Sequence, residues 1–186
     1  LRLGLETALA LALGLIIIRY VVPGNNPAAT PVPTRDPDIP AGRLRFVTNN
    51  NAGVIEADTT TTNAAWNHYA VTFRNSDKMT WLYRNGVLVK QGTIASGFSN
   101  ASATELCIGS WFNQAAFYNG LIDEVRVWNI LLDQTSIQER KNRYLRGDEA
   151  GLQAYYAFSE GEGGVAADFA QNMGGHAKIS GAFWTY

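Results

Sequence analysis

The feature that most restricts the fold of this chain is the pair Asn85-Gly86, which lies between two strand-like runs. The first run covers residues 79–84 and the second begins at Val87. Asn and Gly are the residues that most easily adopt the positive φ angles required at both central positions of a type I′ turn. The pattern therefore predicts a tight β-hairpin with Asn85-Gly86 at its tip.

A further run, residues 66–73, carries large rings at positions of both parities. A strand with apolar groups on both faces is expected inside a sandwich. Composition agrees, because the chain has 18 glycines and is rich in Thr, Asn and aromatic residues, as all-β proteins with many turns are. The formal net charge of -1 gives no reason to expect a nucleic-acid partner.

The third strand-like segment reads Gly-Leu-Ile-Asp-Glu-Val-Arg-Val-Trp-Asn over residues 120–129. In their order and spacing, the three segments resemble the LamG-like jelly rolls of the concanavalin A-like lectin/glucanase superfamily, over residues 41–186. The resemblance implies a mainly β fold: a two-sheet antiparallel jelly-roll sandwich with one short helix. Asp133 is a plausible N-cap for that helix, and Gly147 can end it.

The chain divides into three regions by composition. Residues 1–22 are mostly Leu, Ala, Ile and Val, and residues 23–40 contain all six prolines. Proline fixes φ and removes a donor, so the second region is interpreted as a stiff, extended linker. The β-sandwich is expected over residues 41–186.

Residues 1–22 have two interpretations. Leu and Ala favour a helix, and an apolar N-terminal helix with one early glutamate loosely resembles the N-terminus of type IV pilins. That resemblance implies a filament of identical subunits, in which Glu6 neutralises the N-terminal amine of a neighbour. The alternative is that period-two leucines and the β-branched residues 16–18 form strands of the same sandwich. We take the packed helix as the main interpretation.

Catalysis is not expected. Glucanases in this superfamily place two carboxylates along one strand so that both point into the cleft. Asp123 and Glu124 are adjacent, so on a regular strand they face opposite ways. Glu160 and Glu162 have the right parity, but the glycines around them predict a loop.

Calcium is the one cofactor that the resemblance implies. LamG-like jelly rolls often bind a calcium ion, and Asp123 and Asp168 stand at matching positions. The alternative is structural: Asp123 caps a turn, and Asp168 stabilises a loop through Asx hydrogen bonds.

Sugar binding is the commonest role in the family, and one loop has suitable residue types. Sugars are held by aromatic rings that stack and by amide or carboxylate groups that bind hydroxyls. Trp66, Trp81 and Trp128 lie in strand-like runs and are expected in the core. The predicted ligand-binding residues are Trp111, Asn113, Gln114, Tyr118 and Asn119.

The sequence thus predicts a non-enzymatic binding or adhesion module at the cell surface or outside the cell. The main interpretation is the repeating subunit of a pilus-like filament with its hydrophobic N-terminus in the core. The alternative is a carbohydrate-binding accessory domain of a secreted or membrane-anchored glycan-processing protein.

Overall fold

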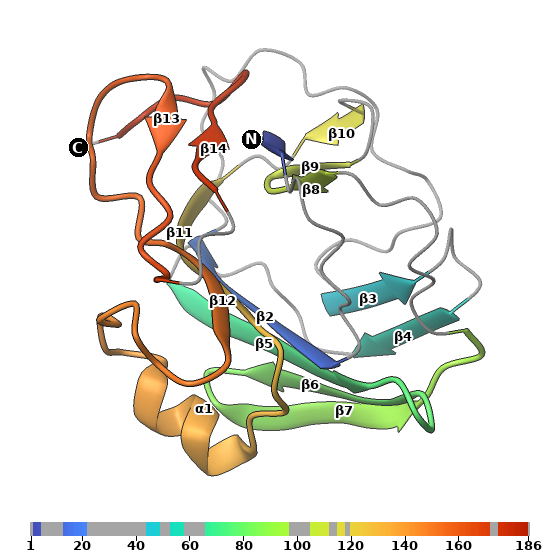
Figure 1. Cartoon of the computed structure of the whole chain (residues 1–186). Coiled ribbons are helices and arrows are strands. Elements are labelled where there is room, and N and C mark those ends of the chain that lie inside the picture. The colour runs from blue at the N-terminus through green and yellow to red at the C-terminus, as the bar shows by residue number, and fades with distance from the viewer. Residues whose placement is uncertain are drawn as a thin grey trace.

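The computed structural model shows a mainly β protein in which one short helix accompanies several antiparallel sheets in the described part of the chain (Figure 1). This confirms the mainly β fold class predicted from the sequence, and the arrangement is consistent with a jelly-roll sandwich. The structure describes residues 2–4, 13–21, 44–48, 53–57, 66–96, 105–111, 115–117, 120–171 and 175–185.

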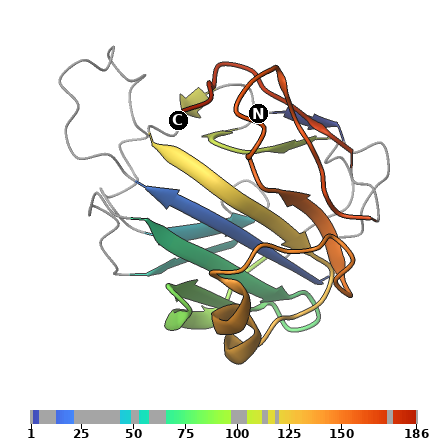
Figure 2. The ribbon, with the colours of Figure 1, turned by 90° about the vertical axis from the view of Figure 1, so that its left-hand side faces the viewer.

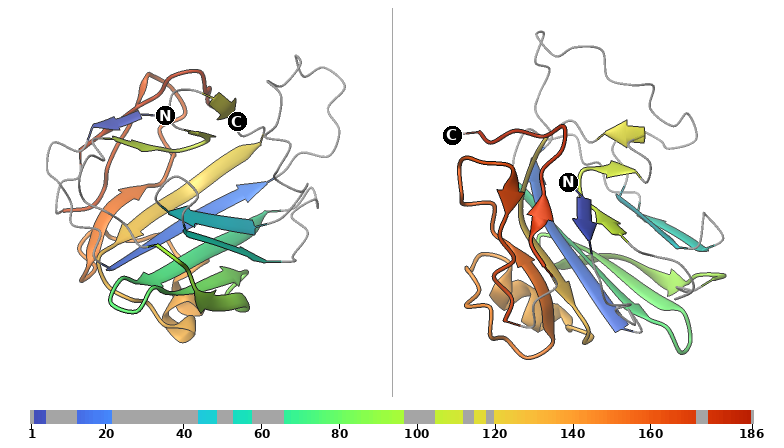
Figure 3. Two further views of the ribbon diagram at one scale, coloured as in Figure 1. Left: turned by 90° about the vertical axis from the view of Figure 1, so that its right-hand side faces the viewer. Right: turned by 45° about the horizontal axis from the view of Figure 1, so that its top comes forward.

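The main layer is a six-stranded sheet in the order β12-β11-β2-β5-β6-β7. Figure 2 shows this sheet from the side that carries α1, and the left view of Figure 3 shows the opposite side, where β3 and β4 lie in front of it. In chain order its strands are β2 (Leu13–Val21), β5 (Asn67–Arg74), β6 (Met79–Arg84), β7 (Val87–Thr93), β11 (Leu121–Trp128) and β12 (Leu152–Tyr156).

The predicted hairpin tip is confirmed between β6 and β7. Asn85 has a φ of 53° and Gly86 a φ of 80°, the pair of positive angles that the turn requires. The Asn85 side chain ties the tip to β5, because its Oδ1 accepts a hydrogen bond of 2.9 Å from the backbone N of His68. Gln138 of the helix donates from Nε2 to the Gly86 carbonyl at 3.0 Å. The tip is therefore fixed from two sides.

The N-terminal segment forms strands where it is described, so the predicted helix over residues 1–22 is wrong there. Leu13–Val21 is β2, hydrogen-bonded to β5 on one side and to β11 on the other. Arg2–Gly4 is β1, which pairs with β14 and β8. A strand between two neighbours has all its backbone groups paired and suits β-branched residues such as the isoleucines at 16–18. The alternative interpretation, strands of the same sandwich, is confirmed for these two segments.

Glu6 and the proline-rich linker expected over residues 23–40 lie outside the described residues. The filament hypothesis required an apolar helix over residues 1–22. Because Leu13–Val21 forms β2 inside the sheet, this part of the segment is not available as that helix. Within the described residues, no helix has the length and apolar character needed to span a bilayer.

A second layer faces the main sheet with three smaller sheets. These are a four-stranded sheet in the order β13-β14-β1-β8 and the two-stranded pairs β3-β4 and β9-β10. Their strands, besides β1, are β3 (Leu44–Thr48), β4 (Gly53–Ala57), β8 (Glu105–Cys107), β9 (Ser110–Trp111), β10 (Ala115–Phe117), β13 (Val165–Ala166) and β14 (Ala177–Lys178).

Two apolar clusters fill the space between the layers. One joins β4 to β5 and β6 through Ile55, Phe73 and Leu82. The other joins β11 and β12 to β13 and β14, with Val125 and Tyr156 at its centre. Full burial of side chains of this size contributes about 1.5–3 kcal/mol each, so these clusters hold the small sheets on the main sheet.

The helix α1 (Gln134–Arg140) covers a third cluster on the outer face of the main sheet, where Ile137 packs with Trp128 and other residues. Its N-cap is Asp133, as predicted, because Asp133 Oδ1 accepts from Ser136 N at 2.8 Å. The prediction that Gly147 ends the helix is wrong, since the helix stops at Arg140.

Candidate functional site

The predicted sugar-binding loop is a short hairpin. Trp111 in β9 is opposite Ala115 in β10, and Ser110 is opposite Phe117. Figure 1 shows β9 and β10 at the top of the molecule, far from α1, and β11 is the next element in chain order. Trp111 thus lies in a strand next to the hairpin turn. The other predicted ligand-binding residues, Asn113, Gln114, Tyr118 and Asn119, lie outside the described residues, so this site stays a prediction.

Asp123, the first predicted calcium ligand, lies half-buried in β11 immediately before a β-bulge. In the pairing of β11 with β2, Asp123 is opposite Arg19 and Arg126 is opposite Ile17. Three residues along β11 therefore span the same length as two residues along β2. The bulge includes Glu124, which has a φ of 56°. β11 is therefore not a regular strand at Asp123 and Glu124, so the alternation of a regular strand cannot be assumed for them.

Asp168, the second predicted ligand, follows β13 and lies along the open edge of β12. Its Oδ1 accepts hydrogen bonds of 2.9 Å from the backbone N of both Tyr155 and Ala170. Its own backbone N donates to His176 Nδ1 at 3.1 Å. The bond to Ala170, two residues on, is the Asx hydrogen bond of the structural alternative. Asp168 therefore holds its loop against the edge of the main sheet.

Neither Asp123 nor Asp168 belongs to a cluster of metal-ligating side chains within the described residues. Calcium takes about 6–8 oxygen ligands at roughly 2.3–2.6 Å, and the described part of the chain contains no group of three metal-ligating side chains. Asp168 and Asp123 are also separated by β12, since Asp168 binds the outer edge of that strand. Asp168 Oδ2 is buried without a hydrogen bond and could accept one more partner. Calcium at Asp123 and Asp168 stays a prediction.

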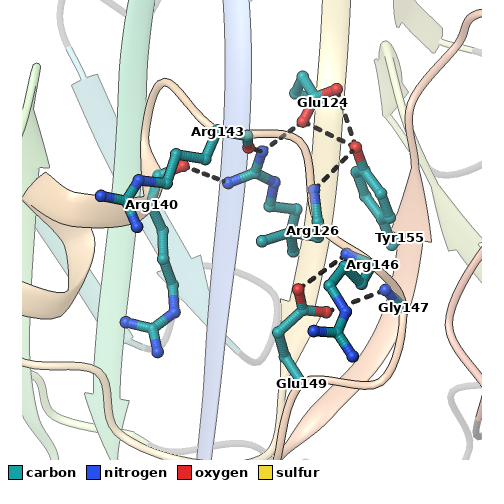
Figure 4. Close-up of polar contacts among 9 residues, drawn as sticks. Glu124, Arg126, Arg140, Arg143, Arg146, Gly147, Glu149 and Tyr155 are labelled. Atoms are coloured by element: carbon teal, nitrogen blue, oxygen red, sulfur yellow. Dashed lines mark hydrogen bonds and ion pairs between the residues drawn. The ribbon is translucent and has the colours of Figure 1, made fainter.

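A buried polar network centred on Arg126 was not predicted from the sequence (Figure 4). The exposed fractions are 4% for Glu124, 1% for Arg126 and 2% for Tyr155. The Glu124 carboxylate forms an ion pair with Arg126 Nη2 and accepts from the Tyr155 hydroxyl, at 3.0 Å on Oε1 and 3.1 Å on Oε2. The Arg126 guanidinium also lies 5.5 Å from the centre of the Tyr155 ring. The carboxylate is paired and closed off from solvent.

The same network fixes the loop that leaves α1. Arg126 Nη1 donates to the Arg140 carbonyl at 2.8 Å, and Nη2 also donates to the Arg143 carbonyl. Carbonyls at a helix C-terminus lack partners within the helix and carry partial negative charge, so a guanidinium stabilises them. Arg126 thereby stabilises the C-terminal end of the helix at Arg140. The available signal was a Glu and an Arg two residues apart within the apolar run of residues 121–128.

We expect this network to weaken at high pH. Burial of the phenol, reinforced by the negative charge of Glu124, raises the pKa of Tyr155 to about 12. An unfolded tyrosine titrates near pH 10, so the fold favours the neutral phenol. The contribution of the neutral Tyr155 phenol to the free energy of unfolding is fully present below pH ~10 and is lost as the pH rises through ~12. Denaturant unfolding across this pH range should show that Tyr155→Phe loses less stability at alkaline pH than the parent. If the free energy of unfolding falls equally steeply with pH in both proteins, the alkaline loss does not come from Tyr155.

The three tryptophans expected in the core differ in burial. Trp128 is 1% exposed and lies in the cluster under α1, as predicted. Trp81 is partly buried, with the Arg74 guanidinium 5.2 Å from the centre of its ring. Trp66 is 43% exposed, so the prediction that it lies in the core is wrong. It immediately precedes β5, outside the strand itself.

Comparison with known proteins supports the fold. The family model described as the concanavalin A-like lectin/glucanases superfamily matches residues 35–138. No curated protein matches the sequence significantly. Among solved structures, the chain is similar to a candidate carbohydrate-binding protein from Bacteroides ovatus ATCC 8483, with 16% identity and a TM-score of 0.64. The match covers 98% of this chain but 58% of that protein.

The chain is also similar to a heptameric SAP-like pentraxin from Limulus polyphemus, with 11% identity and a TM-score of 0.51, over 91% of this chain and 84% of that one. At these identities the two structures bear on the fold alone. The family match covers more than half of the chain and includes the predicted hairpin at Asn85-Gly86 and the strand at residues 121–128. The chain belongs to the concanavalin A-like lectin/glucanases superfamily.

Proposed function

We propose that this domain is a non-catalytic carbohydrate-binding module, acting as an accessory domain of a longer extracellular or cell-surface protein. The observation that carries the proposal is the similarity of nearly the whole chain to a candidate carbohydrate-binding protein, within a superfamily of lectins and glucanases. That protein is considerably longer, since the match covers 58% of it. This supports the role of one module among others.

The use of the described carboxylates supports binding rather than hydrolysis. A glycosidase needs two carboxyl groups that reach the scissile bond from either side. Glu124 is 4% exposed and committed to Arg126 and Tyr155. Glu160 accepts from the backbone N of Ala167 at 2.7 Å, and Asp168 accepts from two backbone N–H groups. These three carboxylates hold strands and loops together.

We place the sugar at the β9-β10 hairpin, on the residue types present there. Aromatic rings stack on the apolar face of a sugar, while amide groups bind its hydroxyls. Trp111 would supply the ring, and Asn113, Gln114, Tyr118 and Asn119 the polar contacts. The hairpin is at an end of the fold, where connecting segments commonly carry binding residues.

The test is the substitution Trp111→Ala with a panel of neutral oligosaccharides as ligands. Loss of a stacking ring should weaken binding about two- to tenfold, because one aromatic contact is worth roughly 0.5–1.5 kcal/mol beyond its buried area. The melting temperature should stay unchanged, and Trp111→Phe should keep most of the affinity. A large fall in melting temperature for Trp111→Ala would show that the ring belongs to the core and would remove it from the site.

A further inference from the structure

A row of side chains crosses β5, β6 and β7 on the face of the main sheet that carries α1. Trp81 of β6 packs against the apolar cluster under this helix, which fixes the face on which its ring lies. In the strand pairing, Trp81 is directly opposite Thr72 of β5 and Gln91 of β7. Residues directly opposite each other in an antiparallel pair share a face, with Cβ atoms about 4.5–5.5 Å apart. Gln91 and Trp81 are therefore neighbours on this face.

Arg74 of β5 reaches the same ring. Its guanidinium lies 5.2 Å from the centre of the Trp81 ring. Arg74 Nε and Nη2 also donate to the two carboxylate oxygens of Asp77, at 2.9 Å and 2.7 Å. A group that is already held in place loses little conformational entropy when it binds a ligand. The set of Arg74, Asp77, Trp81 and Gln91, here called the Trp81 surface, is joined by these contacts and by the strand pairing.

The polar groups of the Trp81 surface are open to solvent. The side chain of Arg74 is 41% exposed and that of Asp77 is 50% exposed, and Gln91 is exposed as well. Within the described part of the chain, Arg74 Nη1 and the Gln91 amide form no hydrogen bond. The surface therefore presents a fixed N–H donor and an amide that both donates and accepts, beside a ring that is only partly buried.

The two charges on the Trp81 surface balance each other. The hydrogen bond from Arg74 lowers the pKa of Asp77 to about 2, so both groups stay charged at neutral pH and the pair has no net charge. An anionic ligand at Arg74 would meet the Asp77 carboxylate beside it, whereas a hydroxyl group can bind to either partner. The charge balance thus favours a neutral ligand with hydroxyl groups.

We propose that the Trp81 surface is a second binding site for neutral oligosaccharides, separate from the β9-β10 hairpin. The proposal rests on the proposed carbohydrate-binding function. The Trp81 ring would contact the apolar face of a sugar, and Arg74 and Gln91 would bind its hydroxyls. Figure 1 shows β6 and β7 at the bottom of the molecule and β9 and β10 at the top, so the two sites lie at opposite ends.

The test is an NMR titration of the whole chain with cellohexaose and maltohexaose, in which the indole N–H signals of Trp81 and Trp111 are followed separately. Both signals should shift in the parent. Arg74→Met should weaken binding at Trp81 about tenfold or more, because hydrogen bonds to charged groups are the strong ones. Gln91→Ala should weaken it about two- to tenfold. Neither variant should change the binding curve reported by Trp111.

The matched control is Lys90→Ala, next to Gln91 in β7. Lys90 is also exposed, but it is opposite Leu82, which belongs to the cluster between the layers, so it lies on the other face of the sheet. This variant should bind like the parent. The melting temperatures of all three variants should stay close to that of the parent, because the substituted side chains are exposed. A hexamer of galacturonic acid is the charged comparison and should bind more weakly at Trp81.

The outcomes separate this proposal from the proposed function. A shift of the Trp111 signal alone would overturn the Trp81 surface and leave the proposed function intact, while no shift of either signal would overturn both. Equal binding curves at Trp81 in the parent, Arg74→Met and Gln91→Ala, or an equal loss in Lys90→Ala, would overturn the assignment of these residues. Tight binding of the galacturonic acid hexamer at Trp81 would overturn the assignment to neutral sugars. A loss confined to Trp81 in the first two variants supports the proposal.

Discussion

Replacing Arg126 with methionine is expected to lower the free energy of unfolding by about 3–5 kcal/mol. The substitution keeps most of the side-chain volume but leaves the Glu124 carboxylate buried, 4% exposed, without its cation. It also removes the donor that pairs the carbonyls of Arg140 and Arg143. The substitution therefore removes both the ion pair with Glu124 and the hydrogen bonds to the two carbonyls, and both losses lower the free energy of unfolding. Chemical denaturation followed by tryptophan fluorescence measures the effect.

Two further variants test the physical cause. The matched control is Arg74→Met, because Arg74 also pairs with a carboxylate, Asp77, at 2.7 Å, but with side-chain exposures of 41% and 50%. Exposed pairs contribute little, so this variant should change stability far less. The double variant Glu124→Leu/Arg126→Met removes both buried charges and should recover part of the loss. A loss in Arg126→Met no larger than that in Arg74→Met would contradict the role given to the network.

The second large effect is expected at Gly147, where alanine should cost about 3 kcal/mol or more. Gly147 has a φ of 89°, which L residues rarely adopt. A Cβ atom there would also lie 1.9 Å from the carbonyl oxygen of Phe169, a distance that only a shift of the backbone can relieve. The shift would break the hydrogen bond from Gln171 N to the Gly147 carbonyl. Unfolding experiments should show the loss of stability.

Gly163 provides the matched control for this prediction. Its φ of 86° is nearly the same, but an added Cβ would meet nothing within 4 Å. Gly163→Ala should therefore cost only the strain of a positive φ, about 1–2 kcal/mol. The difference between the two alanine variants isolates the contact between Gly147 and Phe169. If both variants lose the same amount, the close approach to Phe169 does not determine the stability of this region.

Local residue chemistry was sufficient to predict several elements. The turn at Asn85-Gly86 follows from the small set of residues that tolerate positive φ. The N-cap at Asp133 follows from a carboxylate placed where the first helical N–H groups lack partners. Trp128 in the core follows from a large ring in an apolar strand. Each of these signals acts within a few residues of the chain.

The N-terminal segment was misjudged because its local signal and its tertiary setting conflict. Leu and Ala favour a helix in isolation, but Leu13–Val21 lies between β5 and β11 and completes the sheet. Strand pairing with residues far along the chain provides the backbone hydrogen bonds on both sides of β2. Propensity differences of a few tenths of a kcal/mol per residue do not outweigh these interactions.

For the candidate site, the sequence identified residue types but not their partners. Asp168 was recognised as a functional or loop-stabilising carboxylate, and the structure shows which backbone groups it binds. The network of Glu124, Arg126 and Tyr155 was not recognised, because Tyr155 lies 31 residues from Glu124 along the chain and the two meet only in the folded sheet.

The amino-acid sequence by itself determined the antiparallel β class, the hairpin tip at Asn85-Gly86, the start of the helix at Asp133 and the family resemblance. Turns, caps and alternation depend on φ preferences and hydrogen bonds between near neighbours, which the order of residues specifies directly. Only the tertiary structure decided that β2 lies in the middle of the main sheet and that α1 ends at Arg140. These features depend on groups brought together from distant parts of the chain, where buried charges and unpaired backbone atoms must find partners.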